Sequence, residues 1–311
     1  MTSRAANSAT LRRLRGPIRL RQETRDAILF ALLVGPNLLL FAIFTYWPLL
    51  YNGYLSFVQW DLLAPVKIWV GFDNYRFLLG SAEFARILAN TFVFTAASVG
   101  LTCLLGLVAA LLLNQKLAGR DAVRSIIFSP AMLSGAAIGI VWIYIFDPRY
   151  GLLDIFIRAL GGRSPNWLLS GPWAMAAVII VYVWKNLGYA VVIYLAGLQA
   201  IPRELYEAAR VDGANAWARL WHITLPGLSP VTFFLFLTTI LASFQAFDII
   251  KVMTGGGPVD ATTTLIYYLY QEGFVGFNAG RAGVAAVLLF AIMLSFTIVQ
   301  MRFTERHVHY A

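Results

Sequence analysis

The sequence predicts an all-α, polytopic membrane protein that crosses the bilayer six times. Hydrophobic residues make up 59% of its 311 residues and charged residues only 13%, whereas soluble domains carry about a quarter charged residues. Six runs with few or no charges reach about eighteen residues or more, the length that crosses a hydrocarbon core as a helix. The runs lack strand-type alternation and are too long for barrel strands, so a helical bundle is expected.

The six runs also predict where helices bend and pack. In chain order they are Ala27 to Leu50, Asn90 to Leu113, Ser125 to Phe146, Trp173 to Leu198, Gly227 to Ile250 and Ala282 to Gln300. Pro36 and Pro48 in the first run and Pro130 in the third predict kinks, which neighbouring helices tolerate by pairing the freed carbonyls. Gly135 and Gly139, one turn apart in the third run, predict a close-packed face.

Charge asymmetry predicts the orientation. The segments on one side of the six runs carry fifteen Lys and Arg residues, and the longer loops on the other side carry eight together with seven acidic residues. The side richer in Lys and Arg is expected to be cytoplasmic, so both termini are predicted to lie in the cytoplasm. The membrane is expected to be the inner, cytoplasmic membrane of the cell. The net charge of +9 then indicates contact with anionic lipid of the bilayer and no nucleic-acid partner.

This pattern divides the chain into three parts. Residues 1–26 are an arginine-rich cytoplasmic tail, residues 27–300 form the transmembrane domain, and residues 301–311 are a cytoplasmic C-terminal tail. Because the first apolar run is longer than a secretory signal core and no small-residue cleavage pattern follows it, we expect an uncleaved first helix.

Signs of catalytic or metal chemistry are absent from the sequence. No Gly-Lys pair exists for a P-loop, no G-x-S-x-G elbow occurs, and three histidines with one cysteine offer no zinc set. We therefore expect neither a catalytic residue nor a metal or cofactor on this chain. If transport is driven by ATP, the ATPase is another chain.

The loop over 199–226, on the side predicted to be cytoplasmic, is the most informative segment. Pro202 suits a first helical turn, Glu204 favours the positive helix N-terminus, and Gly213 suits a left-handed stop, which together predict a helix over Arg203 to Val211. A second helix is expected over 214–222, ending before Ile223, with Pro226 beginning the return into the membrane. Two short helices that project from the bilayer would suit insertion into a protein cleft.

A resemblance to a known family rests on this loop. Glu207-Ala208-Ala209, three residues, Gly213, nine residues, then Ile223-x-Leu225-Pro226 resembles the E-A-A loop of binding-protein-dependent ABC importer permeases. In that family the loop is the coupling helix that docks on the ATPase subunit. The resemblance thus implies an ATPase-coupling role for Glu207, Ala208, Ala209, Arg210, Asp212, Gly213, Ile223, Leu225 and Pro226.

Further blocks resemble the subfamily of sugar and glycerol-phosphate permeases. They are Val70 to Tyr75, Leu195 to Pro202, and Gly256-Gly257-Pro258 followed by Thr262-Thr263-Thr264. The C-terminal third looks most like a glycerol-3-phosphate permease subunit, although the same blocks recur among oligosaccharide permeases. The solute expected from the resemblance is glycerol-3-phosphate or a glycerophosphodiester, and the alternative is a neutral oligosaccharide.

The resemblance also implies a fold and a set of partners. The fold is that of a type I ABC importer permease with a cytoplasmic coupling helix. The implied partners are a second homologous permease subunit, two ATPase subunits that bind the ATP and Mg, and an extracytoplasmic solute-binding protein. The chain itself would be a non-catalytic subunit.

Polar residues inside the membrane predict a solute path between the fourth and fifth runs. Lys185 lies in mid-span, where a charge is costly and should face a cavity or a partner. It either attracts an anion on the path, or reaches the interface or pairs with Asp248. Asn186, Phe244 and Gln245 complete the expected path. A rival hypothesis makes the chain a lone ion-coupled carrier with Lys185 and Asp248 as its coupling pair.

Overall fold

The computed structural model describes the backbone of residues 18–115 and 119–307. The chain divides into two compact units, Met1–Tyr54 and Leu55–Ala311. Most of the predicted arginine-rich tail and the last four residues of the predicted C-terminal tail lie outside the described residues.

The first unit is a membrane-spanning helix. It consists of α1 (Ile18–Phe41), the π-helical turn η1 (Ala42–Tyr46) and most of α2 (Trp47–Leu55), which together give one apolar helix over Thr24–Leu55. Its apolar side chains are largely exposed, as expected for a surface that faces lipid. Pro36 lies inside α1 without ending it, so the kink predicted there does not break the helix.

The second unit is a bundle of helices with one small hairpin. Its elements are β1 (Val58–Gln59), β2 (Ile68–Trp69), α3 (Asp73–Leu79), α4 (Ala82–Leu113), α5 (Arg120–Phe128), the 3-10 turn η2 (Ser129–Met132), α6 (Gly135–Ile145), α7 (Leu152–Ala159), α8 (Gly171–Ala200), α9 (Arg203–Val211), α10 (Ala216–Arg219), the π-helical turn η3 (Leu220–Thr224), α11 (Leu225–Gly227), α12 (Ser229–Phe244), α13 (Asp248–Met253), α14 (Leu265–Tyr270), the π-helical turn η4 (Gln271–Val275) and α15 (Ala279–His307). Strands β1 and β2 pair antiparallel, with Val58 opposite Trp69.

The predicted six spans are all helical, and two of them are bent. Four helices within the described residues are long and apolar enough to cross a membrane: Thr24–Leu55, α4, α8 and the Ala279–Arg302 part of α15. Two further spans are helix pairs, with α5–η2 and α6 meeting at 106° and α10–α11 and α12 meeting at 61°. Six spans result if each bent pair is one span, in agreement with the sequence.

Proline and polar residues account for the breaks. Pro130 lies in η2, where α5 gives way to a 3-10 turn, and the bend of 106° follows at Leu133, whose backbone is extended, so the third span is broken close to the predicted position. The fifth run does not continue as one helix to Ile250, as the sequence predicted, because α12 ends at Phe244. The chain then opens over Gln245–Phe247 before α13 begins at Asp248.

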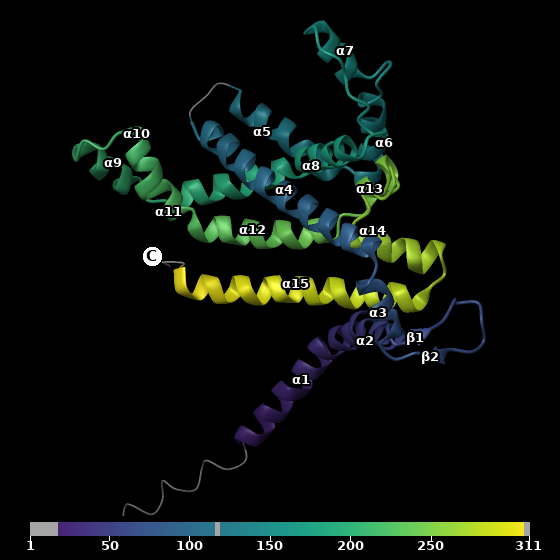
Figure 1. The fold of residues 1–311 in the computed structure, drawn as a ribbon. Coiled ribbons are helices and arrows are strands. Elements are labelled where there is room, and N and C mark those ends of the chain that lie inside the picture. The colour runs from purple at the N-terminus through teal and green to yellow at the C-terminus, as the bar shows by residue number, and fades with distance from the viewer. Residues whose placement is uncertain (1–17, 116–118, 308–311) are drawn as a thin grey trace, which may run out of the picture. The chain divides into compact units, whose positions relative to one another are not determined.

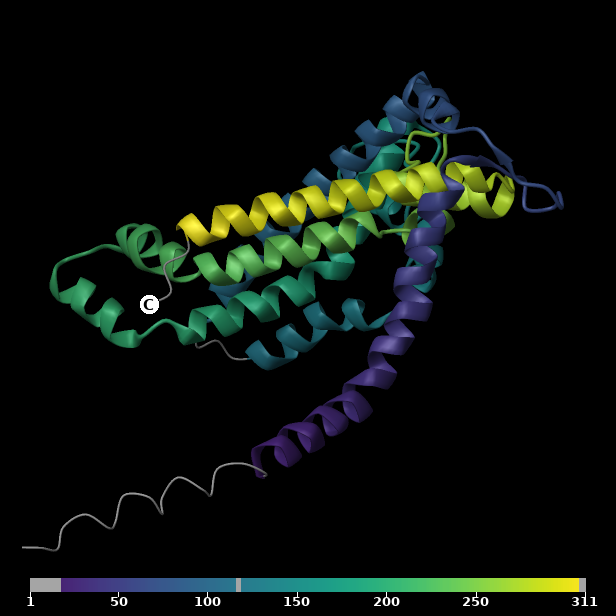
Figure 2. The same cartoon turned by 90° about the horizontal axis from the view of Figure 1, so that it is seen from below.

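Helices α4 and α8 form the centre of the bundle, with α12 against both and α15 against α12 (Figure 1). The two central helices approach so closely that a Cβ at Gly106 would lie 2.6 Å from the Cβ of Ala190. The close-packed face predicted for Gly135 and Gly139 is confirmed, since both glycines pack against α13. Figures 1 and 2 both place α9 to α11 and the end of α15 at one end of the bundle, with α14 and the hairpin at the other.

Candidate functional site

The helix α9 has the bounds that the sequence predicts, Arg203–Val211. Glu204 lies in its first turn and Arg210 in its last, where each charge complements the helix dipole. Gly213 follows with φ +79°, the left-handed conformation expected of a helix stop. The N–H of Gly213 donates to the carbonyl of Arg210 (3.1 Å) and that of Ala214 to the carbonyl of Ala209 (2.8 Å). The end of α9 is therefore closed by its own backbone.

The residues of the E-A-A pattern on α9 are displayed outward. Glu207, Ala208, Arg210, Asp212 and Gly213 are all exposed, and Ala209 is half-buried. Within the described part of the chain, none of the three charged residues among them forms an ion pair. A charged surface without internal partners is suited to contact with another protein.

The segment after α9 differs from the prediction. The helix that begins at α10 does not stop before Ile223 but continues through η3 and α11, and the bend into the membrane lies at Leu228, after Pro226. The helix reaches Pro226 through the π-helical turn η3, in which the Leu225 N–H donates to the Leu220 carbonyl, one residue further back than in an α-helix, and Thr224 and Leu225 keep helical backbone angles. Asn215 caps α10 by accepting from the N–H of Ala218 (2.8 Å).

The three residues of the E-A-A pattern that follow η3 or lie at its end are found at the base of the loop. Ile223 and Leu225 are half-buried, whereas Pro226 is exposed. Gly227 approaches Ile201 so closely that a Cβ on the glycine would lie 2.9 Å from the Cδ1 of Ile201. The loop thus starts and ends at one point, and the segment 201–227 forms a closed projection.

Tyr206, which no sequence pattern singled out, ties the two sides of this projection together. The Tyr206 hydroxyl and the Thr224 hydroxyl are hydrogen bonded at 3.0 Å, and Tyr206 is half-buried while its neighbour Glu207 is exposed. The available signal was a lone tyrosine among the charged and small residues of an exposed helix. Because this bond joins α9 to η3, the helix pair can move as one body.

The five residues predicted to line a path separate into different environments. Phe244 is 1% exposed and packs against Phe92 and Phe296, so it belongs to the helix core. Gln245 is exposed in the break between α12 and α13. Asp248 follows at the start of α13, and α13 contacts α8.

Lys185 and Asp248 do not form the ion pair that the sequence offered as one alternative for Lys185. The carboxylate of Asp248 accepts from its neighbour's N–H (Ile249, 2.9 Å) and lies against Gly135, the first residue of α6. A negative charge there complements the positive end of the α6 helix. Lys185 is half-buried, and no ion pair to it is present among the described residues. Asn186 uses its amide to donate to the carbonyl of Tyr182 (2.8 Å).

The loop between α13 and α14 contains the Gly-Gly-Pro and Thr-Thr-Thr blocks. Thr262, Thr263 and Thr264 are buried, and the Thr262 hydroxyl is hydrogen bonded to that of Thr254 at 2.7 Å. Asn90 of α4 donates to the carbonyls of Asp260 (2.7 Å) and Thr263 (3.2 Å). These bonds fix the loop to the first turns of α4.

Charged groups at this end of the bundle include one perturbed carboxyl. Burial raises the pKa of Glu272, although Arg281, 3.9 Å away, and a hydrogen bond from Tyr268 act in the opposite direction. Two carboxyls in exposed loops behave differently, because backbone N–H donors lower the pKa of Asp61 and of Asp147. In the described residues no group of three or more His, Cys, Asp or Glu side chains could hold a metal ion.

Comparisons with known proteins agree with the E-A-A resemblance. Residues 103–309 match the family described as "Binding-protein-dependent transport system inner membrane component". The sn-glycerol-3-phosphate transport system permease protein UgpA of Rhizobium meliloti (strain 1021) is 37% identical over 292 residues, which cover 92% of this chain and 97% of that protein. The protein of the same name from Agrobacterium fabrum (strain C58 / ATCC 33970) is 36% identical over 286 residues, covering 92% and 97%.

Solved structures show the same fold. A bacterial ABC transporter involved in the import of the acidic polysaccharide alginate is 26% identical with a TM-score of 0.78, covering 93% of this chain and 100% of that one. A bacterial alginate ABC transporter in complex with an alginate pentasaccharide-bound periplasmic protein is 24% identical with a TM-score of 0.80, covering 92% and 96%. The chain therefore belongs to the family of binding-protein-dependent transport system inner membrane components.

Proposed function

We propose that the chain is the transmembrane permease subunit of an ATP-driven importer for sn-glycerol-3-phosphate, a glycerophosphodiester or a related sugar-type solute. The observation that carries this proposal is the similarity to sn-glycerol-3-phosphate permeases over more than nine-tenths of both chains. The alginate importer, another relative by sequence and fold, also handles an acidic solute. An anionic solute is therefore favoured over a neutral oligosaccharide.

The closed projection 201–227 would couple the bundle to an ATPase. Its charged tip around Glu207 and Gly213 is exposed, and its base is held by the Tyr206–Thr224 bond and by the close approach of Gly227 to Ile201. A rigid projection of this kind transmits a displacement instead of absorbing it. Closure of the ATPase subunits would then move the projection and rotate the helices as rigid bodies, which changes the side to which the path opens.

Lys185 is the candidate anion contact on that path. A mid-span ammonium group costs about 2.5–3.5 kcal/mol on insertion scales unless it meets water or an opposite charge. Since the described residues supply no ion pair for Lys185, a wet path between two permease subunits is the environment that best relieves this cost. The proposed path also includes Asn186, which follows Lys185 on α8. It further includes Gln245 in the break of the fifth span and Asp248 directly after that break.

The remaining subunits follow from the same proposal. A second permease of similar fold would complete the path, two ATPases would bind ATP and Mg, and an extracytoplasmic binding protein would deliver the solute. Both termini would lie in the cytoplasm, on the side of α9. This chain would hold no cofactor and make or break no covalent bond.

Reconstitution tests the proposal directly. The complete complex, with its binding protein outside, is placed in proteoliposomes that contain ATP, and uptake of labelled sn-glycerol-3-phosphate and of a labelled neutral maltooligosaccharide is compared. We expect ATP-dependent uptake of sn-glycerol-3-phosphate and none of the neutral sugar. Uptake of the neutral sugar alone would refute the proposed solute, and solute uptake by this chain without ATPase subunits would refute the importer class.

A further inference from the structure

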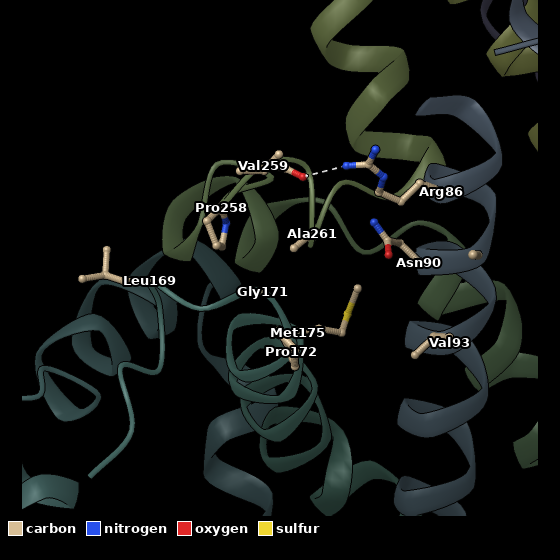
Figure 3. A pocket seen from close by; sticks show the side chains of 11 residues that line it. Arg86, Asn90, Val93, Leu169, Gly171, Pro172, Met175, Pro258, Val259 and Ala261 are labelled. Atoms are coloured by element: carbon tan, nitrogen blue, oxygen red, sulfur yellow. Dashed lines mark hydrogen bonds between the residues drawn. The ribbon is translucent and has the colours of Figure 1, made fainter. Parts of the chain in front are cut away.

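A groove of about 610 Å³ opens beside the first turns of α4, at the end of the bundle opposite α9 in Figure 1. Figure 3 shows the side chains that line it. Its walls are the first turns of α4, the first turns of α8 and the loop between α13 and α14. Arg86 and Asn90 come from α4, Met175 comes from α8, and Pro258 and Val259 come from the loop. Apart from Arg86 and Asn90, the lining is apolar.

Arg86 brings a positive charge that this chain leaves largely uncompensated. Its guanidinium donates one hydrogen bond, from Nη1 to the carbonyl of Val259 at 3.3 Å, and no carboxylate pairs with it among the residues that the structure describes. Glu83, one turn earlier on α4, forms no ion pair with Arg86. A guanidinium carries five N–H donors, so Arg86 retains donors in the fork geometry that matches phosphate oxygens.

The opposite wall of the groove is fixed. Both donor bonds of the Asn90 amide go to the loop, at the carbonyls of Asp260 and Thr263, and the Asp260 carboxylate accepts from the Thr263 hydroxyl (3.0 Å). The amide oxygen of Asn90 stays available to accept from a hydroxyl. The groove thus offers an anion contact, a hydroxyl acceptor and the apolar surface of Met175, each on a preformed wall.

The depth of Arg86 suits a site at the outer mouth of the bundle. The 32 residues of α4 span about 48 Å at 1.5 Å per residue, which exceeds the roughly 30 Å hydrocarbon core. Arg86 lies in the second turn of α4, so it falls at the level of the lipid headgroups and the water beyond them. Both a solute arriving from outside and a lipid headgroup can reach this level.

We propose that the groove is a binding site for a phosphate ester, with Arg86 as its anion contact and Asn90 as its hydroxyl acceptor. This inference rests on the proposed function only for the identity of the solute as a glycerol phosphate. The chemistry of the site, one phosphate group with adjacent hydroxyls, is common to that solute and to a phosphatidylglycerol headgroup.

The test compares three variants of the complete complex. Arg86→Gln removes the charge and keeps a donor for the Val259 carbonyl, Arg86→Lys keeps the charge, and Arg163→Gln removes an exposed charge that does not line the groove. In phosphatidylcholine liposomes we expect Arg86→Gln to raise the KM for labelled sn-glycerol-3-phosphate about tenfold, the loss expected for one charge-assisted contact. Arg86→Lys should stay within about threefold of the parent, and Arg163→Gln should match it.

Two further measurements identify the ligand. If phosphatidylglycerol in the liposomes raises the KM of the parent and not that of Arg86→Gln, the lipid headgroup occupies the site. Equilibrium binding of labelled inorganic phosphate to the purified complex without its binding protein should be about tenfold weaker in Arg86→Gln. This binding experiment decides the groove even if the parent complex imports no glycerol phosphate, a result that would refute the proposed function alone. Unchanged phosphate binding together with unchanged KM in Arg86→Gln would overturn the site.

Discussion

The contact between α4 and α8 allows two identical substitutions in one helix to be compared. Gly106 and Gly100 both lie inside α4, but a Cβ at Gly106 would lie 2.6 Å from the Cβ of Ala190, whereas a Cβ at Gly100 meets nothing within 4 Å. Carbon atoms pack best at about 3.5–4.0 Å, so Gly106→Ala must push the two helices apart by roughly 1 Å. Both variants gain about 1 kcal/mol from the helix propensity of alanine.

The difference between the two variants therefore isolates packing. Overpacking costs about 1–3 kcal/mol, and we expect Gly106→Ala to be less stable than Gly100→Ala by that amount. The measurement is the free energy of unfolding by SDS of the protein in mixed micelles, followed by tryptophan fluorescence. The second substitution Ala190→Gly removes the clashing methyl and leaves the nearest backbone atoms of residue 190 at 3.5 and 3.6 Å, so Gly106→Ala should cost little stability when it is compared with the single variant Ala190→Gly. Equal stability of Gly106→Ala and Gly100→Ala would refute the close approach of α4 and α8.

Three other perturbations test separate parts of the account. Tyr206→Phe removes the bond to Thr224 and should destabilise the projection by about 0.5–1.5 kcal/mol, seen as faster amide hydrogen exchange over 203–213; unchanged exchange would contradict its bracing role. Because burial raises the pKa of Glu272 above its ordinary value of 4.5, the folded state holds that proton more tightly than the unfolded state does, and stability falls as pH rises through the interval between the two values. The Tm of the parent minus that of Glu272→Gln should accordingly fall as pH rises above about 4.5, and a pH-independent difference would contradict the burial effect. Lys185→Met should lower uptake of sn-glycerol-3-phosphate with assembly intact, while Lys185→Arg keeps most of it; normal uptake by Lys185→Met would remove Lys185 from the path, and loss of assembly would show a structural role instead.

What the sequence could predict depended on how local the signal was. The bounds of α9 follow from Pro202 and Gly213, whose backbone preferences act within one or two residues, and the structure confirms both ends. The change from α-helix to 3-10 turn at Pro130 is local in the same way. The continuation of α10 through Ile223 was missed, because the π-helical turn that precedes Pro226 has no sequence signal that distinguishes it from a helix end before a proline.

Contacts between segments that are distant in the sequence could not be predicted from hydropathy or charge patterns. Asp248 and Lys185 are the obvious opposite charges of neighbouring spans, yet the Asp248 carboxylate lies against Gly135, more than a hundred residues earlier in the chain. The break after Phe244 is likewise invisible to hydropathy, since Gln245–Phe247 interrupts an apolar run by only one polar residue before Asp248. The groove at Arg86 is lined by three segments that are far apart in the sequence, and neither their charge nor their spacing predicts that they meet in the fold.

The coupling role of α9 is the central claim, and two glycines offer a matched test of it. Gly213 ends α9 and Gly161 follows α7 on the opposite side of the predicted topology; their φ values are +79° and +81°, and a Cβ at either meets nothing within 4 Å. Valine in this left-handed conformation costs about 1–2 kcal/mol at either site, a five- to thirtyfold shift in the local equilibrium. The measurement is the number of solute molecules taken up per ATP hydrolysed by the reconstituted complex. The account predicts that Gly213→Val lowers this ratio at least fivefold and Gly161→Val leaves it at the parent value; an unchanged ratio in Gly213→Val, or equal losses in the two variants, would contradict it.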